Sequence, residues 1–151
     1  MGRFKNWKQP EFDGNGWAFT TGQNVYDVIN FNWLCFHSEN MKIGKDVDVG
    51  AFTLIQAAYG VELGDDVEIG PHCYICSHST IDDKKGKVII KKGAKIGAHS
   101  VVMPGVTIGE NTIVGALSFV NKSLPPNVIA FGSPCKVKVC KKKSLQSIKQ
   151  D

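Results

Sequence analysis

Aliphatic residues recur every six positions over most of this chain, and that period constrains its fold more than any other feature. The longest unbroken run consists of Ile90, Ile96, Val102, Ile108, Val114 and Val120. Two shorter runs precede it: Ile43, Val49 and Ile55, then Leu63, Ile69 and Ile75. A period of six matches neither the 3.6-residue helix nor the two-residue strand alternation. It is typical of a solenoid in which each six-residue unit forms a short strand and a tight turn, and three units form one coil.

Two further positions of the six-residue unit carry a recurrent kind of residue. A glycine often follows the aliphatic residue, and the position four after the aliphatic residue is usually small or branched. The second class comprises Val47, Thr53, Val67, Cys73, Ser79, Ala94, Ser100, Val106, Thr112 and Ser118. We therefore predict an all-β fold, a parallel β-helix of about five coils.

The repeat divides the chain into three regions. Residues 1–24 lack it and are rich in aromatic residues, Gly and Asn, so we expect an irregular N-terminal cap over the open end of the solenoid. Residues 25–139 form the β-helix domain, and residues 140–151 a basic tail. A polar, turn-prone departure at 81–89 predicts a loop inserted at a corner of the solenoid. The clear coils are expected at 43–60, 63–80, 90–107 and 108–125.

Composition narrows the partners and the compartment. The net charge is only +4, and the chain has neither a basic helix nor an aromatic platform, so nucleic-acid binding is not expected. The N-terminal segment is not apolar, and no stretch has the roughly 20 apolar residues that a membrane span needs, so neither a signal segment nor a membrane span is expected. Five cysteines at irregular spacing disfavour a disulfide framework and favour a reducing cytoplasm.

Three of the four histidines hold the same position in their repeats. His72, His78 and His99 each lie three residues after the aliphatic residue, which is a turn position. The phase places His72 and His99 on the same face of adjacent coils, so we expect them to be near neighbours. His78 lies on the next face, immediately before the predicted loop, and loops on rigid scaffolds often carry function. It is either an ordinary surface residue or a general base, since a neutral imidazole accepts a proton near pH 7.

Several motifs in the second half of the chain point to a known family. They are Ile96-Gly97-Ala98-His99, Pro104-Gly105-Val106-Thr107-Ile108-Gly109, Val114-Gly115-Ala116, Pro125-Pro126-Asn127 and Gly132-Ser133-Pro134-Cys135-Lys136-Val137. With them, the chain from about Ile43 to Val139 resembles the hexapeptide-repeat acyltransferases, in particular the galactoside, maltose and xenobiotic acetyltransferases and their polysaccharide-modifying relatives. The resemblance implies a left-handed β-helix, acetyl-CoA as co-substrate and a homotrimer.

The resemblance also implies a catalytic residue. His78, in Ile75-Cys76-Ser77-His78, matches the family's catalytic histidine. Two positions depart from the family pattern. Thr80 stands where members often have a second histidine, and Lys95 stands where many have Trp.

Five further residues match the family's cofactor-binding positions. Ala98 and Ala116 match positions whose backbone lines the pantetheine arm of coenzyme A. Asn121 and Lys122 match a Thr-Lys pair near the cofactor, and Lys136 matches a basic position that can meet the 3′-phosphate. No metal is implied.

The acceptor side matches the family less well. The segment 50–58 lacks the Asn and Asp that the sugar acetyltransferases carry there, so a simple galactoside or maltose is not the expected acceptor. Asn30, Asn32, Trp33 and Gln56 are candidates on composition alone. We expect transfer of an acetyl group to a hydroxyl or amino group of a sugar, such as a nucleotide-linked amino sugar or a precursor in lipopolysaccharide biosynthesis. The choice between O- and N-acetylation stays open.

Two other functions remain as alternatives. One is a zinc-dependent enzyme resembling the γ-class carbonic anhydrases, with His72, His78 and His99 meeting at a subunit interface. The other is a non-catalytic β-helix binding protein. The pattern His72-Cys73-x-x-Cys76-x-His78 also offers four potential zinc ligands, but Cys73 takes a core-side position whereas Cys76 takes the glycine position, so the two thiols do not converge.

Overall fold

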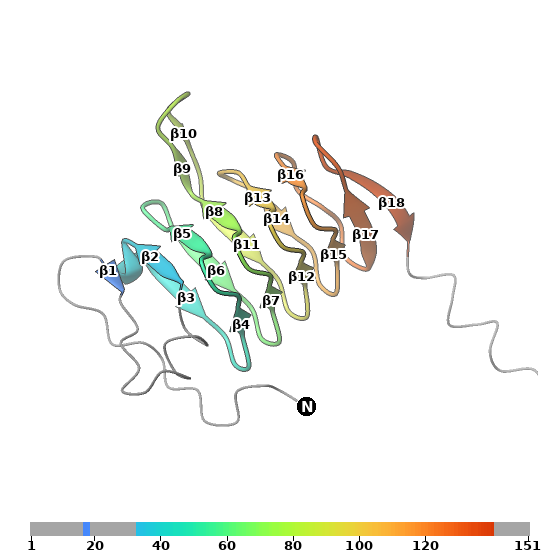
Figure 1. Cartoon of the computed structure of the whole chain (residues 1–151), viewed down its shortest axis with the longest axis horizontal. Coiled ribbons are helices and arrows are strands. Elements are labelled where there is room, and N and C mark those ends of the chain that lie inside the picture. The colour runs from blue at the N-terminus through green and yellow to red at the C-terminus, as the bar shows by residue number, and fades with distance from the viewer. Residues whose placement is uncertain (1–16, 19–32, 141–151) are drawn as a thin grey trace, which may run out of the picture.

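The computed structural model describes residues 17–18 and 33–140, and its strands wind into a solenoid of about five coils (Figure 1). The first sheet has six strands: β1 (Trp17–Ala18), β2 (Leu34–Phe36), β5 (Leu54–Gln56), β8 (Tyr74–Cys76), β13 (Val101–Val102) and β16 (Phe119–Val120). The second has four: β3 (Met41–Ile43), β6 (Val61–Leu63), β11 (Val88–Ile90) and β14 (Thr107–Ile108). The third has six: β4 (Asp48–Val49), β7 (Glu68–Ile69), β12 (Lys95–Ile96), β15 (Ile113–Val114), β17 (Val128–Phe131) and β18 (Lys136–Cys140).

Each of the first four coils therefore contributes one strand to each sheet, and equivalent strands of successive coils pair in parallel. In the last coil, a single parallel bridge of Leu124 to Ile108 takes the place of a strand in the second sheet. Ile55 of β5, for example, pairs with Ile75 of β8, which pairs with Val102 of β13. The predicted all-β solenoid is confirmed, and the parallel sheets agree with the left-handed β-helix that the resemblance implies. We call the turn from the first sheet to the second the first corner, that from the second to the third the second corner, and that back to the first sheet the third corner.

The aliphatic residues of the repeat and its small or branched residues form the core. Ile55, Ile75, Val102 and Val120 are fully buried in the first sheet, and the small residues of the repeat are buried beside the corners. Ser79 is the exception among them, because it lies half-buried in the inserted hairpin. Buried hydroxyl groups in the second class donate to main-chain carbonyls: Thr53 Oγ1 lies 2.9 Å from Gly70 O, and Thr112 Oγ1 lies 2.6 Å from Pro125 O. Since each hydroxyl has a partner, these polar groups fit the apolar interior.

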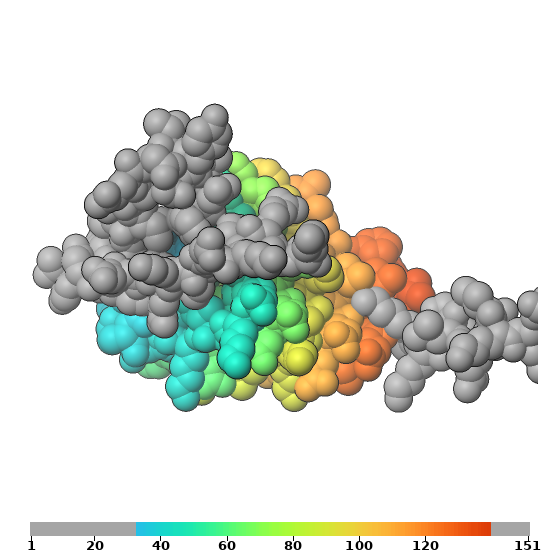
Figure 2. All heavy atoms as spheres, turned by 90° about the horizontal axis from the view of Figure 1, so that it is seen from below, coloured from blue at the N-terminus to red at the C-terminus, as the bar shows by residue number. Residues whose placement is uncertain are grey.

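Both chain ends extend beyond the described part. The expected cap at 1–24 lies outside the described residues except for Trp17–Ala18, which pair antiparallel with β2 at the edge of the first sheet. The start of the predicted β-helix domain, 25–32, and residues 141–151 of the predicted tail also lie outside them. At the other end, β18 turns back antiparallel to β17, so the coils lie between β1 and β18 (Figure 1). Seen from below, the coils form successive bands along the molecule (Figure 2).

The inserted loop starts and ends earlier than the sequence predicts. In the structure the excursion spans 77–87, and a hairpin of β9 (His78–Ser79) and β10 (Lys84–Lys85) projects from the first corner (Figure 1). The prediction of 81–89 was wrong at its end, because Val88 and Ile89 belong to β11 and pair with Val61 and Glu62. His78 therefore lies within the hairpin rather than before it.

Within the described residues, no helix is long or apolar enough to cross a lipid bilayer.

The core contacts predict a clear contrast between two isoleucines. Ile75→Ala should lower the free energy of unfolding by about 2–5 kcal/mol, because Ile75 is fully buried between adjacent coils. Ile81→Ala should change it by less than about 0.5 kcal/mol, because Ile81 is 98% exposed at the hairpin tip. Urea denaturation of both variants measures the contrast, and equal losses would contradict the assigned core.

Candidate functional site

The β9–β10 hairpin is fixed to the solenoid by Ser77, the buried residue that precedes it. The Ser77 hydroxyl donates to Gln56 O at 2.9 Å and accepts from Tyr59 N at 2.9 Å, which ties it to the preceding coil. Ser77 O accepts from Gly86 N at 3.0 Å, and this bond closes the base of the hairpin. Because both of its ends are held, the hairpin presents His78 from a rigid scaffold rather than from an open loop.

His78 and Asp83 form a hydrogen-bonded pair within this hairpin. His78 Nε2 lies 3.1 Å from Asp83 Oδ1, and the His78 side chain is 22% exposed. Hydrogen bonds from Lys85 and then from His78 hold the pKa of the Asp83 carboxyl below its usual range. An ionised carboxylate only accepts hydrogen bonds, so the contact places the imidazole proton on Nε2 and leaves Nδ1 to accept another.

Two further side chains complete the surroundings of His78. The Tyr59 ring meets the imidazole edge to face, with centroids 5.3 Å apart and planes at 75°. Lys85 Nζ lies 3.0 Å from Asp83 Oδ2 and 5.7 Å from the centroid of the Tyr59 ring. The sequence alone indicates no functional role for Tyr59, Asp83 or Lys85. The polar run 82–86 next to a candidate base was the one feature of the sequence that could have indicated them. The six-residue period does not predict which residues pair across an antiparallel hairpin, so it could not bring them to His78.

Ala98 and Ala116 lie at the third corner, on adjacent coils. A β-carbon at Gly97 would lie 2.4 Å from Ala116 N, so the chain passes very close to the next coil at this position. Ala116 and Gly97 line a groove of about 470 Å³ that extends over the third sheet. Lys95 lies in the same groove, and its Nζ is 2.6 Å from Glu68 Oε1. The position where the family often has Trp is therefore occupied by one half of an ion pair.

The remaining candidate residues divide between two corners. Asn121 and Lys122 follow β16 at the first corner. Their coil lies two coils beyond the coil from which the His78 hairpin projects, and two coils are about 10 Å apart at the usual spacing between strands. Lys136 begins β18 beside Cys135, whose N–H donates to Phe119 O at 2.8 Å, and this contact places it near the third corner. The structure thus groups His78 with Asn121 and Lys122 at the first corner. It groups Ala98 and Ala116 with Lys136 at the third.

The outward face of the first sheet separates these two groups. Its residues in register are half-buried and apolar: Leu34, Leu54, Tyr74, Val101 and Phe119. The equivalent row on the third sheet begins with Asp48, Glu68 and Lys95. The first sheet therefore presents the apolar side of the prism.

The third corner carries bulky residues in a strained backbone conformation. Phe52, His72, His99 and Leu117 occupy equivalent positions with φ between 57° and 61°, a region that bulky side chains disfavour. The equivalent positions of the second corner use Asp46, Asp66, Gly93, Asn111 and Asn127, which tolerate it.

The rings of His72 and His99 stack at the third corner. Their centroids lie 4.8 Å apart and their planes 2° apart, and this confirms the predicted neighbourhood of the two imidazoles. Phe52 stacks on His72 at 5.1 Å. His78 lies at a different corner, so this chain alone does not bring the three turn histidines together. Among the described residues, no three His, Cys, Asp or Glu side chains gather as a metal-binding group.

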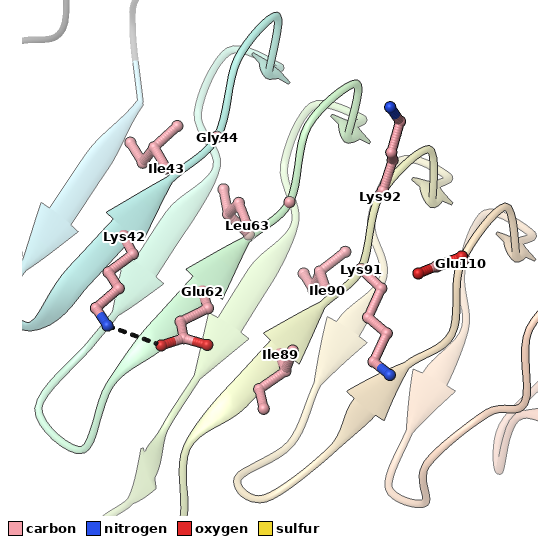
Figure 3. Close-up of a pocket in the computed structure, with 11 residues that line it drawn as sticks. Lys42, Ile43, Gly44, Glu62, Leu63, Ile89, Ile90, Lys91, Lys92 and Glu110 are labelled. Atoms are coloured by element: carbon pink, nitrogen blue, oxygen red, sulfur yellow. Dashed lines mark ion pairs between the residues drawn. The ribbon is translucent and has the colours of Figure 1, made fainter.

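A second groove, of about 500 Å³, lies over the second sheet and the second corner (Figure 3). Glu62 in this groove accepts a hydrogen bond from Lys87 and pairs with Lys42 at 3.4 Å, and the Lys87 bond is the main reason that the pKa of Glu62 is lowered. Lys91 and Lys92 also line the groove. None of the candidate catalytic or cofactor-binding residues lines this groove.

The four residues predicted as acceptor-binding candidates lie in different parts of the structure. Asn30 and Asn32 lie outside the described residues, whereas Trp33 is buried in the core, where it does not face a ligand. Gln56 accepts from the Ser77 hydroxyl at 3.3 Å, so it borders the hairpin.

Cys35, Cys73, Cys76 and Cys135 are free thiols. Burial raises the pKa of each, to about 12 for Cys35, which disfavours the reactive thiolate.

Comparison with known proteins identifies similar chains. The family pattern described as bacterial transferase hexapeptide (six repeats) matches residues 87–122. A galactoside O-acetyltransferase of Escherichia coli K12 is 36% identical over 129 residues, which cover 78% of this chain and 62% of that protein. This chain thus spans about three fifths of the length of that relative.

Solved structures add two similar folds. A galactoside acetyltransferase in complex with coenzyme A aligns with a TM-score of 0.65 and 31% identity, over 70% of this chain and 57% of that one. A point mutant of AntD, an N-acyltransferase from Bacillus cereus, in complex with dTDP-4-amino-4,6-dideoxyglucose and coenzyme A, aligns with a TM-score of 0.56 and 25% identity. That alignment covers 87% of this chain and 93% of that one.

Proposed function

Because this chain belongs to the hexapeptide-repeat acetyltransferase family, we propose that it transfers an acetyl group from acetyl-CoA to a hydroxyl or amino group of a sugar. The observation that carries the proposal is the His78–Asp83 pair at the first corner. The carboxylate fixes the tautomer of the imidazole, and Nδ1 is then the nitrogen that can take a proton from the acceptor. The similarity to acetyltransferases that bind coenzyme A supports the choice of donor.

The proposed reaction is a direct transfer in a ternary complex. The acceptor oxygen or nitrogen attacks the thioester carbonyl carbon as Nδ1 of His78 removes its proton. The developing oxyanion is stabilised by a backbone N–H, and collapse of the intermediate breaks the carbon–sulfur bond. The proton then leaves His78 with the thiol of coenzyme A, so the base is restored. Asp83 holds the imidazole in one orientation throughout.

The proposed cofactor site is shared between subunits of a homotrimer. The first-corner residues His78, Asn121 and Lys122 and the third-corner residues Ala98 and Ala116 lie at opposite ends of the first-sheet strands. If three prisms associate through the apolar face of the first sheet, the first corner of one copy faces the third corner of the next. A cleft between copies would then contain both groups, with Lys122 and Lys136 available for phosphates.

The acceptor is proposed as a sugar that carries a hydroxyl or an amino group. The similarity to a galactoside O-acetyltransferase supports a sugar hydroxyl, and the similarity to AntD, an N-acyltransferase in complex with an amino-sugar nucleotide, supports a sugar amino group. A nucleotide-linked amino sugar or a precursor in lipopolysaccharide biosynthesis fits the class. We propose the cytoplasm as the compartment, in keeping with the four free thiols in the described chain.

Removal of the proposed base should affect turnover rather than donor binding. His78→Ala should lower kcat about 10²- to 10⁴-fold with a hydroxyl acceptor, whereas the affinity for acetyl-CoA should change little. His72→Asn and His99→Asn are the controls, because neither residue belongs to the β9–β10 hairpin, and each should cost much less. Thiol release measures the rates, and near-normal kcat in His78→Ala would exclude His78 as the base.

Lys136 should act on donor affinity through the 3′-phosphate. Lys136→Ala should raise the KM for acetyl-CoA with little change in kcat, since a charge pair with phosphate acts before and during the reaction alike. The same variant should show no loss with a 3′-dephosphorylated donor, which serves as the control. An equal KM change for both donors would remove Lys136 from the phosphate site, and no change for either would do the same.

The apolar face of the first sheet should hold the trimer together. Val101→Lys places a charge in the middle of that face and should dissociate the trimer at micromolar concentration in sedimentation experiments. Ile89→Lys is the matched control, because Ile89 is a half-buried outward residue of the second sheet. A wild-type protein that sediments as a monomer, or two variants that behave alike, would contradict the arrangement.

A further inference from the structure

The β9–β10 hairpin contains a second charged residue whose position is tied to His78. In the antiparallel register of the hairpin, Lys85 is directly opposite His78. Residues in such cross-strand positions have β-carbons about 4.5–5.5 Å apart and interact directly. The placement of Lys85 therefore follows from the hairpin register, which also brings Asp83 to the imidazole.

Lys85 and His78 share one carboxylate. Lys85 Nζ lies 2.9 Å from Asp83 Oδ1 and 3.0 Å from Oδ2, while Oδ1 also meets His78 Nε2 at 3.1 Å. The hydrogen bond to Asp83 is the main cause of the raised pKa of Lys85. Asp83 sits on the turn with φ of 52°, and 74% of its side chain is exposed. The hairpin register and the contact with His78 keep Asp83 beside the imidazole, and Lys85 pairs with the carboxylate in that position.

The charge of Lys85 also opposes the electrostatic effect of Asp83 on His78. A carboxylate beside an imidazole stabilises the protonated ring, and a protonated ring cannot act as a base. An ammonium that pairs with the same carboxylate offsets this effect. Two further titratable groups lie beside His78: the Tyr59 phenol on the preceding coil, and the buried Cys76 thiol, which accepts a hydrogen bond from the His78 main chain. Asp82, on the same turn as Asp83, is held by a hydrogen bond from the Ser79 side chain. None of these pairs with Asp83.

We propose that Lys85 is a positioning residue for the transfer reaction: it pairs with the Asp83 carboxylate that contacts His78 and offsets its charge, so that the imidazole can accept a proton from the acceptor. The inference rests on the proposed function, in which His78 is the base. It adds a third member, supplied by the same hairpin, to the His78–Asp83 pair. Asp83 alone would orient the ring but would also favour its protonated form.

The test is the pH dependence of two hairpin variants. Lys85→Met leaves Asp83 with His78 and without the ammonium that offsets its charge, so the acid limb of the kcat profile should move to higher pH by about half a unit, the size expected for partly exposed charge pairs. Activity should therefore fall most near pH 6 and recover above pH 8. Lys85→Arg keeps the charge and the hydrogen bonds and should follow the wild-type profile. Lys84→Met, on the same strand, is the matched control.

A second readout separates this inference from the proposed activity. The NMR titration of the His78 ring, followed in labelled protein without any acceptor, should move to higher pH in Lys85→Met and stay unchanged in Lys85→Arg and Lys84→Met. A titration curve of Lys85→Met that coincides with the wild type would overturn the role of Lys85, as would an acid limb of its kcat profile that stays at the wild-type pH. A shifted titration in a protein that transfers no acetyl group would instead overturn the proposed function and leave the charge coupling standing.

Discussion

Successive coils of this solenoid stack so closely at their corners that several positions have no room for a β-carbon. Such an atom at Gly50 would lie 2.4 Å from Pro71 N, and one at Gly109 would lie 2.3 Å from Pro126 N. This close stacking keeps the strands of each sheet in parallel register and buries the aliphatic rows. Because the corners are rigid, an excursion that begins and ends at a corner is held at both ends. The functional geometry depends on that constraint.

The β9–β10 hairpin is such an excursion, and its chemistry follows from its register. Ser77 and Gly86 close its base, and the antiparallel pairing then brings Asp83 and Lys85 to His78. Asp83 has an exposed side chain, yet it lies beside His78 because hydrogen bonds of Ser77 fix the base of the hairpin to the solenoid. The third corner shows the opposite use of the scaffold, since bulky residues there adopt a backbone conformation that costs about 1–2 kcal/mol per residue.

The sequence predicts the periodic part of this molecule and misses the aperiodic part. The spacing of Ile75 and Val102 gives their burial, and the phase of His72 and His99 gives their contact, because both follow from stacking of equivalent positions. The end of the insertion was misplaced because Val88 and Ile89 precede the residue at which the regular period resumes. The roles of Asp83 and Lys85 depend on the turn inside the hairpin, which the six-residue period does not encode. The matches of Asn121 and Lys122 to cofactor positions stay predictions.

The most direct test of the account is a crystal structure of the protein with acetyl-CoA bound. We expect the thioester at the first corner, within reach of an acceptor held by Nδ1 of His78. The pantetheine arm should lie along Ala98 and Ala116 of the neighbouring copy. A cofactor whose sulfur lies away from His78, for example in the groove over the second sheet, would contradict the proposed site.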